Sequence, residues 1–467
     1  MTQTDAPMPN RPRARSAGLA RRIGAALTAV LVTLPLAVPA RAAGGVQVVR
    51  DAEVETLLRD YATPVLKAAG LKSNRVQIVL VNDQSFNAFV DGQRIFINTG
   101  ALTAASVPNE IIGVIAHEAG HLAGGHQQRL REQIAAARTL AIVGGLLGAG
   151  AIAAGSIAGN SGGAQAGGAL ITAAPSVAQR SLLSYRRSEE MNADQAAARY
   201  LNATGQSIRG MLTTFERFSQ SLSLAGVQVD PYQISHPLPR ERIALLEELA
   251  RKSKYFDAQD PKQLVARHNL MRAKIAAYTG GASAVARLFA NDRTSLAARY
   301  GDAIATDLSG NSTAALQKLD ALIREQPNNP YFHEFRGEVL IKLRKSPEAI
   351  KAFNQAVKLD RTKSPLIRAR LGFALVASGE RANMAKAIDE LRASLQSEPE
   401  NYSAYRYLSQ AYAQTGDVAN AELIMAEGYF RAGNGREAKV FAARALQKLP
   451  PGSPGAVRAN DILTIGK

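Results

Sequence analysis

The sequence predicts an α+β protein in which a mostly helical domain with a small β-sheet precedes an all-α solenoid of helical repeats. Short runs near the N-terminus alternate as strands do, and the motif His117-Glu-Ala-Gly-His121 lies in an apolar helical stretch. In the C-terminal third, small residues recur at a period near 34. We therefore expect a signal peptide at 1–42, the first domain at 43–275 and the repeats at 276–467.

The composition restricts the chemistry available to this chain. Its 467 residues include no cysteine, so disulfides, thiolate catalysis and cysteine-ligated zinc are excluded. The formal net charge is +17, of which residues 1–42 contribute +5 from six arginines and one aspartate. A basic surface favours anionic partners. Because the sequence shows no nucleic-acid motif and no basic run interleaved with aromatics, we expect no nucleic-acid partner.

The N-terminus has the pattern of a secretory signal. Arginines are frequent over 11–22, an apolar segment covers 23–38, and Ala40-Arg41-Ala42 is a small-x-small cleavage site. We therefore expect secretion with cleavage after Ala42. The alternative is a retained N-terminal membrane anchor, for which the apolar segment is short.

A helix and three short strands are predicted before the histidine motif. Apolar residues recur at helical spacing over 51–69. Alternating or β-branched runs indicate strands over 75–81, 87–90 and 94–98, with an Asp-Gly turn between the last two. A small sheet containing a hairpin is therefore expected immediately before the motif.

The histidine motif predicts a metal site. His117 and His121 are four residues apart, so on a helix they lie on the same face and their ring nitrogens can reach one zinc ion. Glu118 beside them can take a proton from water, which completes the HExxH pattern of metal-dependent hydrolysis. The alternative is an ordinary amphipathic helix that carries two histidines.

The helix that carries the motif is expected over 108–136. Asn109 is a candidate N-cap, and the face that contains Ile111, Ile112, Val114 and Ile115 is expected to be buried. His126 follows His121 by five residues and falls off the motif's face, so it is expected at the surface.

An edge strand beside such a metal commonly pairs with an extended substrate. Asn87 to Phe89 is the candidate for this role. The alternative is an edge strand with a purely structural role.

The stretch 139–174 is rich in alanine and glycine and carries no charge. A break at 159–163 favours two helical arms joined by a loop, and the first arm has about the length of a membrane span although it is weakly hydrophobic. Three interpretations remain open: a soluble hairpin packed over the site, a hairpin in peripheral contact with a membrane, and a true membrane span.

A helix that opens near Tyr185 and continues to Leu201 offers the rest of the site. Catalytic zinc requires a third protein ligand and an open position. Glu190 and Asp194 are one turn apart, so Glu190 can coordinate the metal while Asp194 accepts a hydrogen bond from a ligand imidazole. Glu189 is the rival ligand. The alternative is an acidic first turn favoured by the helix dipole.

These residues together resemble the M48 family of zinc metalloproteases. The resemblance rests on His117-Glu-Ala-Gly-His121 and on Tyr185-Arg-Arg-Ser-Glu-Glu-Met-Asn-Ala-Asp194, and Asn87-Ala-Phe is similar to the family's hairpin before the motif. It implies a zincin-type protease domain with one Zn²⁺ per chain. By resemblance, Glu190 is the third ligand and Asp194 and Arg187 match the family's aspartate and arginine. Arg186 stands where serine is usual.

A second histidine motif, His236-Pro-Leu-Pro-Arg-Glu-Arg242, follows. A His-Pro with an arginine six residues after the histidine resembles the secreted members of the family. This resemblance implies that His236 lies at the active site, either stabilising the oxyanion or acting as a displaceable fourth ligand. It places Arg242 beside the ligands or the substrate. The alternative is a loop histidine.

The C-terminal third predicts tetratricopeptide repeats. Ala315, Ala349, Ala387 and Ala421 are spaced 34, 38 and 34 residues apart. Such repeats stack into a solenoid with a concave binding surface. Large apolar residues recur at the same intervals as the alanines: Leu319, Phe353, Leu391 and Met425. Glycines recur at a similar period: Gly301, Gly337 and Gly372. Whether 260–290 is an earlier repeat or a linker stays open.

The combination of signal peptide, protease core and repeats is similar to secreted, repeat-bearing members of the family. It implies a periplasmic endopeptidase in quality control or assembly of outer-membrane proteins. The expected partners are protein substrates, namely misfolded or unassembled outer-membrane proteins, and the assembly machinery, recruited through the repeats. The alternative is a repeat-based chaperone or scaffold with a mostly autoinhibited protease. An integral membrane protease is disfavoured because several strong spans are lacking.

Overall fold

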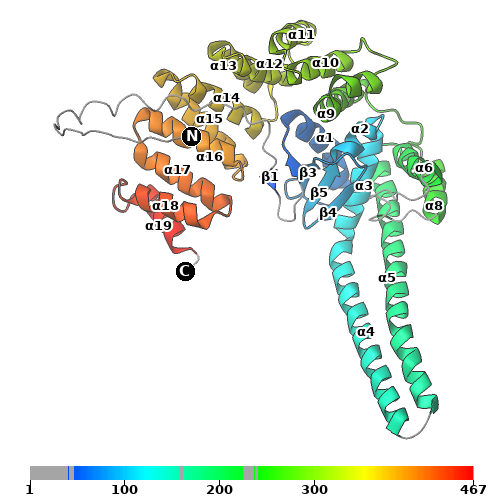
Figure 1. Ribbon diagram of the computed structural model, residues 1–467. Coiled ribbons are helices and arrows are strands. Elements are labelled where there is room, and N and C mark those ends of the chain that lie inside the picture. The colour runs from blue at the N-terminus through cyan, green and yellow to red at the C-terminus, as the bar shows by residue number, and fades with distance from the viewer. Residues whose placement is uncertain (1–39, 42–46, 158–160, 225–235, 237–239, 466–467) are drawn as a thin grey trace, which may run out of the picture. The chain divides into compact units, whose positions relative to one another are not determined.

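The computed structural model describes five stretches of the chain: 40–41, 47–157, 161–224, 236 and 240–465. Most of the predicted signal peptide therefore falls outside the described residues. The described chain contains a small sheet, a group of helices around it, a long helical hairpin and a series of short helices toward the C-terminus (Figure 1). This is the predicted α+β class.

The sheet has five strands in the order β1-β2-β3-β5-β4. β3 and β5 are parallel, and the remaining neighbours are antiparallel. The strands are β1 (Ala40–Arg41), β2 (Gln47–Val49), β3 (Gln77–Val81), β4 (Ala88–Asp91) and β5 (Arg94–Asn98). The three predicted strands are confirmed, and β4 forms one edge of the sheet.

Helix α3 (Pro108–Gly124) lies in the centre of the first core. Its residues from Pro108 to His121 are all buried, because several elements pack against it, among them α1 (Ala52–Ala68), α5 (Ser161–Ala203) and α6 (Arg209–Leu224). The predicted face of Ile111, Ile112, Val114 and Ile115 is buried as expected. The described residues of this region also form the shorter helices α2 (Thr99–Ala104) and α8 (Arg240–Arg251).

The motif helix begins at Pro108 as predicted, but its predicted N-cap and its predicted end are wrong. The N-cap is Val107, whereas Asn109 lies inside α3 and uses its side chain to accept from Gly210 N and to donate to Ser207 O. The helix ends at Gly124 and is capped by Gly125, whose left-handed φ of 65° suits glycine. A new helix, α4 (His126–Ile157), then begins.

The alanine- and glycine-rich region forms a helical hairpin. Helices α4 and α5 run side by side (Figure 1). The expectation that a helix opens near Tyr185 is wrong, because α5 already begins at Ser161 and continues without interruption to Ala203. Among the described residues, one stretch, His126–Ala154, is long and apolar enough to cross a membrane, and only 12% of its most apolar window is buried.

The predicted repeats form successive helices that pack on their neighbours. Gly337 faces the Phe353 ring and Gly372 faces Leu391, so closely that an added Cβ would lie within 3 Å of them. The glycines and the large apolar residues that recur at the predicted period therefore contact each other between neighbouring helices. The helices are α9 (Lys262–Leu288), α10 (Leu296–Leu308), α11 (Ser312–Glu325), α12 (Pro330–Lys342), α13 (Ser346–Leu359), α14 (Pro365–Ala377), α15 (Met384–Ser397), α16 (Tyr402–Thr415), α17 (Val418–Arg431), α18 (Gly435–Leu446) and α19 (Pro454–Thr464).

Helix α9 connects the two regions and runs through the boundary predicted at 275/276. Met271 and Ile275 pack into the core around α3, whereas Leu270 and Ala273 pack with α10. One helix therefore contributes to both cores.

Candidate metal centre

Three side chains of the motif are buried on α3, and the two histidine rings among them face each other. His117, Glu118 and His121 are all buried, with exposed fractions of 1%, 0% and 7%. The Nε2 atoms of the two histidines lie 3.0 Å apart, as expected for residues one helical turn apart. The motif therefore has the geometry that its spacing predicts.

Helix α5 approaches α3 closely at Gly120. A Cβ at this position would lie 2.9 Å from Ala193 O and 3.0 Å from Ala193 Cα, so a larger residue would push the helices apart. This approach brings Glu190 and Asp194 to the histidines, and both carboxylates are buried.

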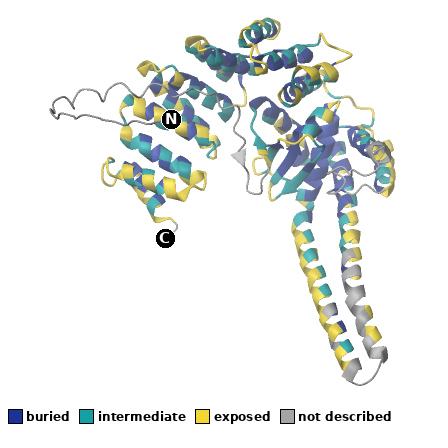
Figure 2. Ribbon diagram, viewed as in Figure 1, coloured by how far each residue is buried: buried dark blue, intermediate teal, exposed yellow. Residues whose placement is uncertain are grey.

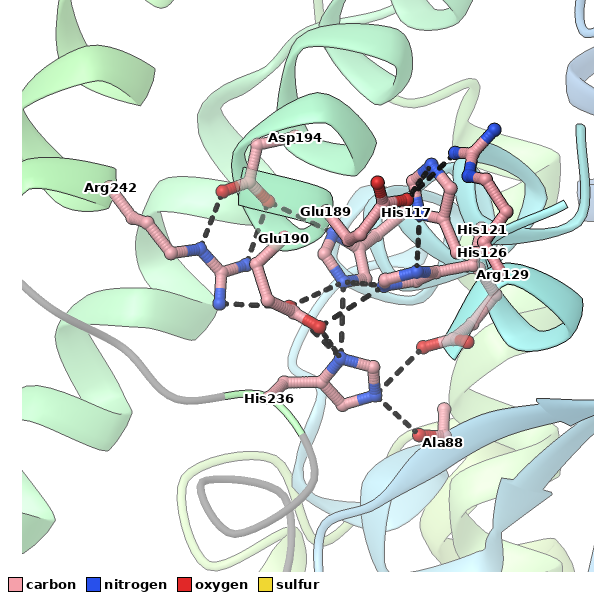
Figure 3. Close-up of polar contacts among 11 residues, drawn as sticks. Ala88, His117, His121, His126, Arg129, Glu189, Glu190, Asp194, His236 and Arg242 are labelled. Carbon is pink, nitrogen blue, oxygen red and sulfur yellow. Dashed lines mark hydrogen bonds and ion pairs between the residues drawn. The ribbon is translucent and has the colours of Figure 1, made fainter. Parts of the chain in front are cut away.

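Four residues supply ligand atoms that all lie within 4.8 Å of one another: His117, His121, Glu190 and His236 (Figure 3). Nδ1 of His236 lies 3.1 Å from both Glu190 oxygens and 3.3 Å from His117 Nε2. His236 precedes α8 by four residues, and its Nε2 lies 3.3 Å from Ala88 O on the edge strand β4.

A buried chain of polar contacts orients His117. Its Nδ1 lies 2.9 Å from Asp194 Oδ1. Arg242, which is fully buried, donates to both oxygens of Asp194 and also lies 2.9 Å from Glu190 Oε2. Burial raises the pKa of Asp194, but the hydrogen bonds and charges of His117 and Arg242 outweigh it and hold the pKa below its usual value. The ionised carboxylate therefore accepts from Nδ1–H, which leaves the His117 Nε2 lone pair facing the cluster.

A second contact chain orients His121, and it involves a residue that the sequence misplaced. His126 is buried rather than at the surface. Its Nδ1 lies 2.9 Å from His121 Nδ1, and its Nε2 lies 2.7 Å from Glu189. Gly124 leaves room for this ring, because a Cβ there would lie 2.1 Å from His126 Nε2. Burial, together with the nearby His121, lowers the pKa of His126 to about 4, so the ring is neutral at pH 7.

The tautomers follow from this neutral ring. Nε2–H of His126 donates to the Glu189 carboxylate, so Nδ1 of His126 accepts from Nδ1–H of His121. The lone pair of His121 is then on Nε2 and faces the lone pair of His117. Glu189 is thus engaged with His126 and with Arg129 Nη2 at 2.9 Å, and it does not join the four-residue cluster.

Glu118 is the buried carboxylate beside the cluster. Within the described part of the chain, neither of its oxygens has a hydrogen-bond partner. His236 Nε2 lies 3.5 Å from Oε1. Burial of a carboxylate without partners is costly, so these oxygens fit a role toward water or substrate. They line a cleft of about 180 Å³, together with Phe89 and Val90 of β4.

The donor set fits a metal ion. Two imidazole lone pairs face each other, and Glu190 adds a carboxylate. Burial raises the pKa of Glu190, but the charge of His236 and the hydrogen bonds of the three histidines outweigh this effect, so its pKa lies well below the usual value. Imidazoles with one carboxylate in a tetrahedral arrangement are typical ligands of catalytic zinc. A divalent cation would satisfy these groups together.

Two predicted site residues belong neither to this cluster nor to the contact chains that orient it. Asn87 is half-buried and precedes β4, where its carbonyl accepts from Asn98 N. Arg187 is exposed on α5 and does not line the cleft, whereas Arg186 does.

Comparison with known proteins agrees with this geometry. Residues 49–250 match the model of peptidase family M48. Residues 309–364 and 379–439 match the tetratricopeptide repeat. The structure of the tetratricopeptide protein YrrB resembles the chain with a TM-score of 0.31 and 18% identity, and it covers 38% of this chain and 92% of that one.

Three relatives match between 54% and 88% of the chain. The beta-barrel assembly-enhancing protease of Escherichia coli (strain K12) is 22% identical over 420 residues, which is 88% of this chain and 82% of that protein. The protein of the same name from Yersinia pestis is 23% identical over 344 residues, 72% of this chain and 68% of its own length. A Vibrio cholerae relative is 27% identical over 265 residues, so the match spans about half of each protein. Residues 49–250 therefore form a peptidase domain of the M48 family, tetratricopeptide repeats follow it, and the chain is related to the beta-barrel assembly-enhancing proteases at 22–27% identity.

Proposed function

We propose that this chain is a zinc-dependent endopeptidase in which His117, His121 and Glu190 hold one Zn²⁺. The observation that carries the proposal is the buried cluster, with ligand atoms within 4.8 Å of one another and the carboxylate of Glu118 beside it. Two imidazoles and one carboxylate are a known ligand set of zinc peptidases.

The chemistry divides between the metal and the protein. A bound zinc ion supplies Lewis acidity toward water and the scissile carbonyl. Glu118 accepts a proton from the attacking water and delivers it to the leaving amine. Asp194 fixes the tautomer of His117 through the contact at 2.9 Å. The low accessibility of Glu118 keeps competing water away from this proton transfer.

The edge strand β4 is the proposed place for the substrate. Phe89 and Val90 line the cleft that also contains Glu118, and the strand is at the edge of its sheet. An extended peptide that adds to this edge would run past the cluster. Asn87 at the start of the strand would contact the same peptide. The substrates are therefore extended segments of unfolded or partly folded proteins.

We place this activity in the periplasm, in quality control or assembly of outer-membrane proteins. Support comes from the names of the relatives that match most of the chain. The repeats would recruit misfolded or unassembled outer-membrane proteins or the assembly machinery, because stacked repeats offer an extended binding surface.

The test is metal dependence of peptide cleavage. We expect the purified protein to contain one zinc per chain and to cleave casein, to lose cleavage when a chelator removes the metal, and to regain it when zinc is added. Cleavage that persists in metal-free protein would contradict the proposal.

A second candidate function rests on His236, which is the fourth member of the cluster. Four protein ligands would saturate zinc and leave no open position. The chain would then act mainly as a chaperone or scaffold, with its protease closed at rest. His236→Ala should raise casein cleavage if this ligand is inhibitory, and lower it if His236 stabilises the oxyanion. His333→Ala, a histidine of the repeats, should leave the rate unchanged.

A further inference from the structure

We infer that the outer part of the α4–α5 hairpin inserts into a lipid bilayer with anionic headgroups and holds the peptidase at the membrane surface. This part, called the tip below, consists of residues 140–157 of α4 and the part of α5 packed beside them. The inference deepens the proposed function, on which it rests, because it names the surface near which substrate would be cleaved.

The first observation is apolar surface at the tip of α4. Five large apolar side chains are exposed there, with Leu146 at 69% and Leu147 at 62%. The others are Leu140, Ile142 and Val143, and Val177 on α5 is also exposed. Figure 2 shows exposed positions along much of α4. Soluble proteins rarely leave a contiguous group of such residues in water. Only 12% of the most apolar stretch of α4 is buried, whereas the core helix of a soluble protein is mostly buried.

The second observation is the helix contact inside the hairpin. Gly144 and Gly148 are buried, whereas Val143 and Leu147 next to them are exposed. This is a Gly-xxx-Gly stripe, which lets two helices approach closely without large side chains. Both arms are helical, so their backbone hydrogen bonds are satisfied internally, as hydrocarbon requires. The small residues thus face the partner arm and the large apolar ones face outward.

The third observation is the distribution of charge. No charged residue occurs from Thr139 to Gln179. An exposed arginine flanks this uncharged stretch at each end, Arg138 on α4 and Arg180 on α5. Arg131 and Arg187, also exposed, lie further from the tip. Basic residues beside an apolar segment match anionic headgroups, and this favours a membrane over a second copy of this basic chain.

The dimensions set the position of the active site. At about 1.5 Å per residue, the arm from Leu140 to Ile157 is about 27 Å long, close to the hydrocarbon thickness of about 30 Å. Arg138 and His126, at the base of α4, are then about 18 Å apart along the helix. The cleft, which His126 lines, therefore stands roughly 20 Å from the headgroups. Chain segments within this distance of a membrane are the substrates that it reaches.

Fluorescence tests the insertion directly, because the chain contains no tryptophan. Leu147→Trp introduces a single reporter at the tip, and Val457→Trp, which replaces a residue 52% exposed on α19, is the matched control. With vesicles of phosphatidylglycerol and phosphatidylethanolamine, we expect the Leu147→Trp emission to shift to the blue and to be quenched by lipids brominated in their acyl chains. The control should do neither.

Two results would overturn the inference. One is an unchanged Leu147→Trp emission on addition of these vesicles. The other is a blue shift that depends on protein concentration without lipid, together with a dimer in light scattering, which would assign the surface to a second copy.

Binding variants test the apolar and basic parts separately. Leu146→Asp/Leu147→Asp should weaken cosedimentation with these vesicles roughly tenfold or more, because carboxylates are costly in hydrocarbon, whereas Val457→Asp should not. Arg138→Glu/Arg180→Glu should remove the preference of the protein for vesicles that contain phosphatidylglycerol over vesicles of phosphatidylcholine. An equal preference in wild type and variant would contradict the role of the arginines. Casein cleavage by wild type without vesicles reports the proposed function independently, so either claim can fail alone.

Discussion

The guanidinium of Arg242 donates to both oxygens of Asp194, from Nε at 2.7 Å and from Nη2 at 2.9 Å. Both side chains are fully buried. The same carboxylate lies 2.9 Å from His117 Nδ1, and Nη1 of the guanidinium lies 2.9 Å from Glu190 Oε2. One arginine on α8 therefore fixes two proposed zinc ligands that come from α3 and α5.

Arg242→Lys should weaken zinc binding. A single ammonium group cannot replace the planar fork that contacts both carboxylates. We expect a zinc affinity about 10–100 times lower, the usual effect of losing a group that orients a ligand, and a lower melting temperature. Zinc competition with a chromogenic chelator measures the first and calorimetry the second. Arg251→Lys is the matched control on the same helix, because its side chain is 80% exposed. Equal affinities for Arg242→Lys and wild type would contradict the proposed role.

His126→Ala should also weaken zinc binding, because His126 connects the His121 ring to Glu189. Without it, the Nδ1 proton of His121 loses its acceptor, and the ring is no longer held with Nε2 toward the cluster. We expect roughly a tenfold lower zinc affinity, measured by the same competition assay. His333→Ala is the control. If His126→Ala bound zinc as tightly as wild type, His126 would be a buried neighbour without a role in orienting the ligand.

His268 predicts a pH dependence of stability away from the metal centre. It is fully buried, with Nε2 2.9 Å from Ala105 O and Nδ1 3.0 Å from Tyr61 Oη. Burial lowers its pKa from 6.5 to about 4. Between these values the unfolded chain binds more protons than the folded chain, so the free energy of unfolding falls as pH falls from 6.5 toward 4. The slope from this group is about 1.4 kcal/mol per pH unit.

His268→Gln should lose this part of the slope, because glutamine does not titrate. Urea unfolding at pH 7 and pH 5 measures it in the variant and in wild type. His333→Gln should keep the wild-type slope. An unchanged slope in His268→Gln would show that the acid sensitivity comes from other groups.

Local patterns predicted the parts of the fold and site that depend on local sequence. The spacing of His117 and His121 predicted that both rings lie on one face, and the structure confirms it. The repeat period predicted stacked helices, and these bring Gly337 against Phe353. The fold class and the three strands before the motif followed from alternation in the same way. These features need no knowledge of distant contacts.

Features that depend on chain reversals or long-range contacts were harder to predict. The prediction that His126 lies at the surface assumed one continuous helix through Gly125. The helix ends there instead, because glycine at a helix C-terminus readily adopts the left-handed conformation that terminates it. Glu190 and Asp194 belong to a helix that begins at Ser161 and continues through Pro175, so the start expected near Tyr185 was wrong. His236 lies 119 residues after His117, and resemblance rather than spacing indicated it.

Glu118→Gln tests the central claim most directly, because it removes the proposed proton acceptor and leaves the proposed ligands in place. Zinc content and casein cleavage are measured on the same preparation as wild type. We expect one zinc per chain in both proteins and a loss of cleavage of at least about a hundredfold in the variant. Cleavage at the wild-type rate by zinc-loaded Glu118→Gln would contradict the account.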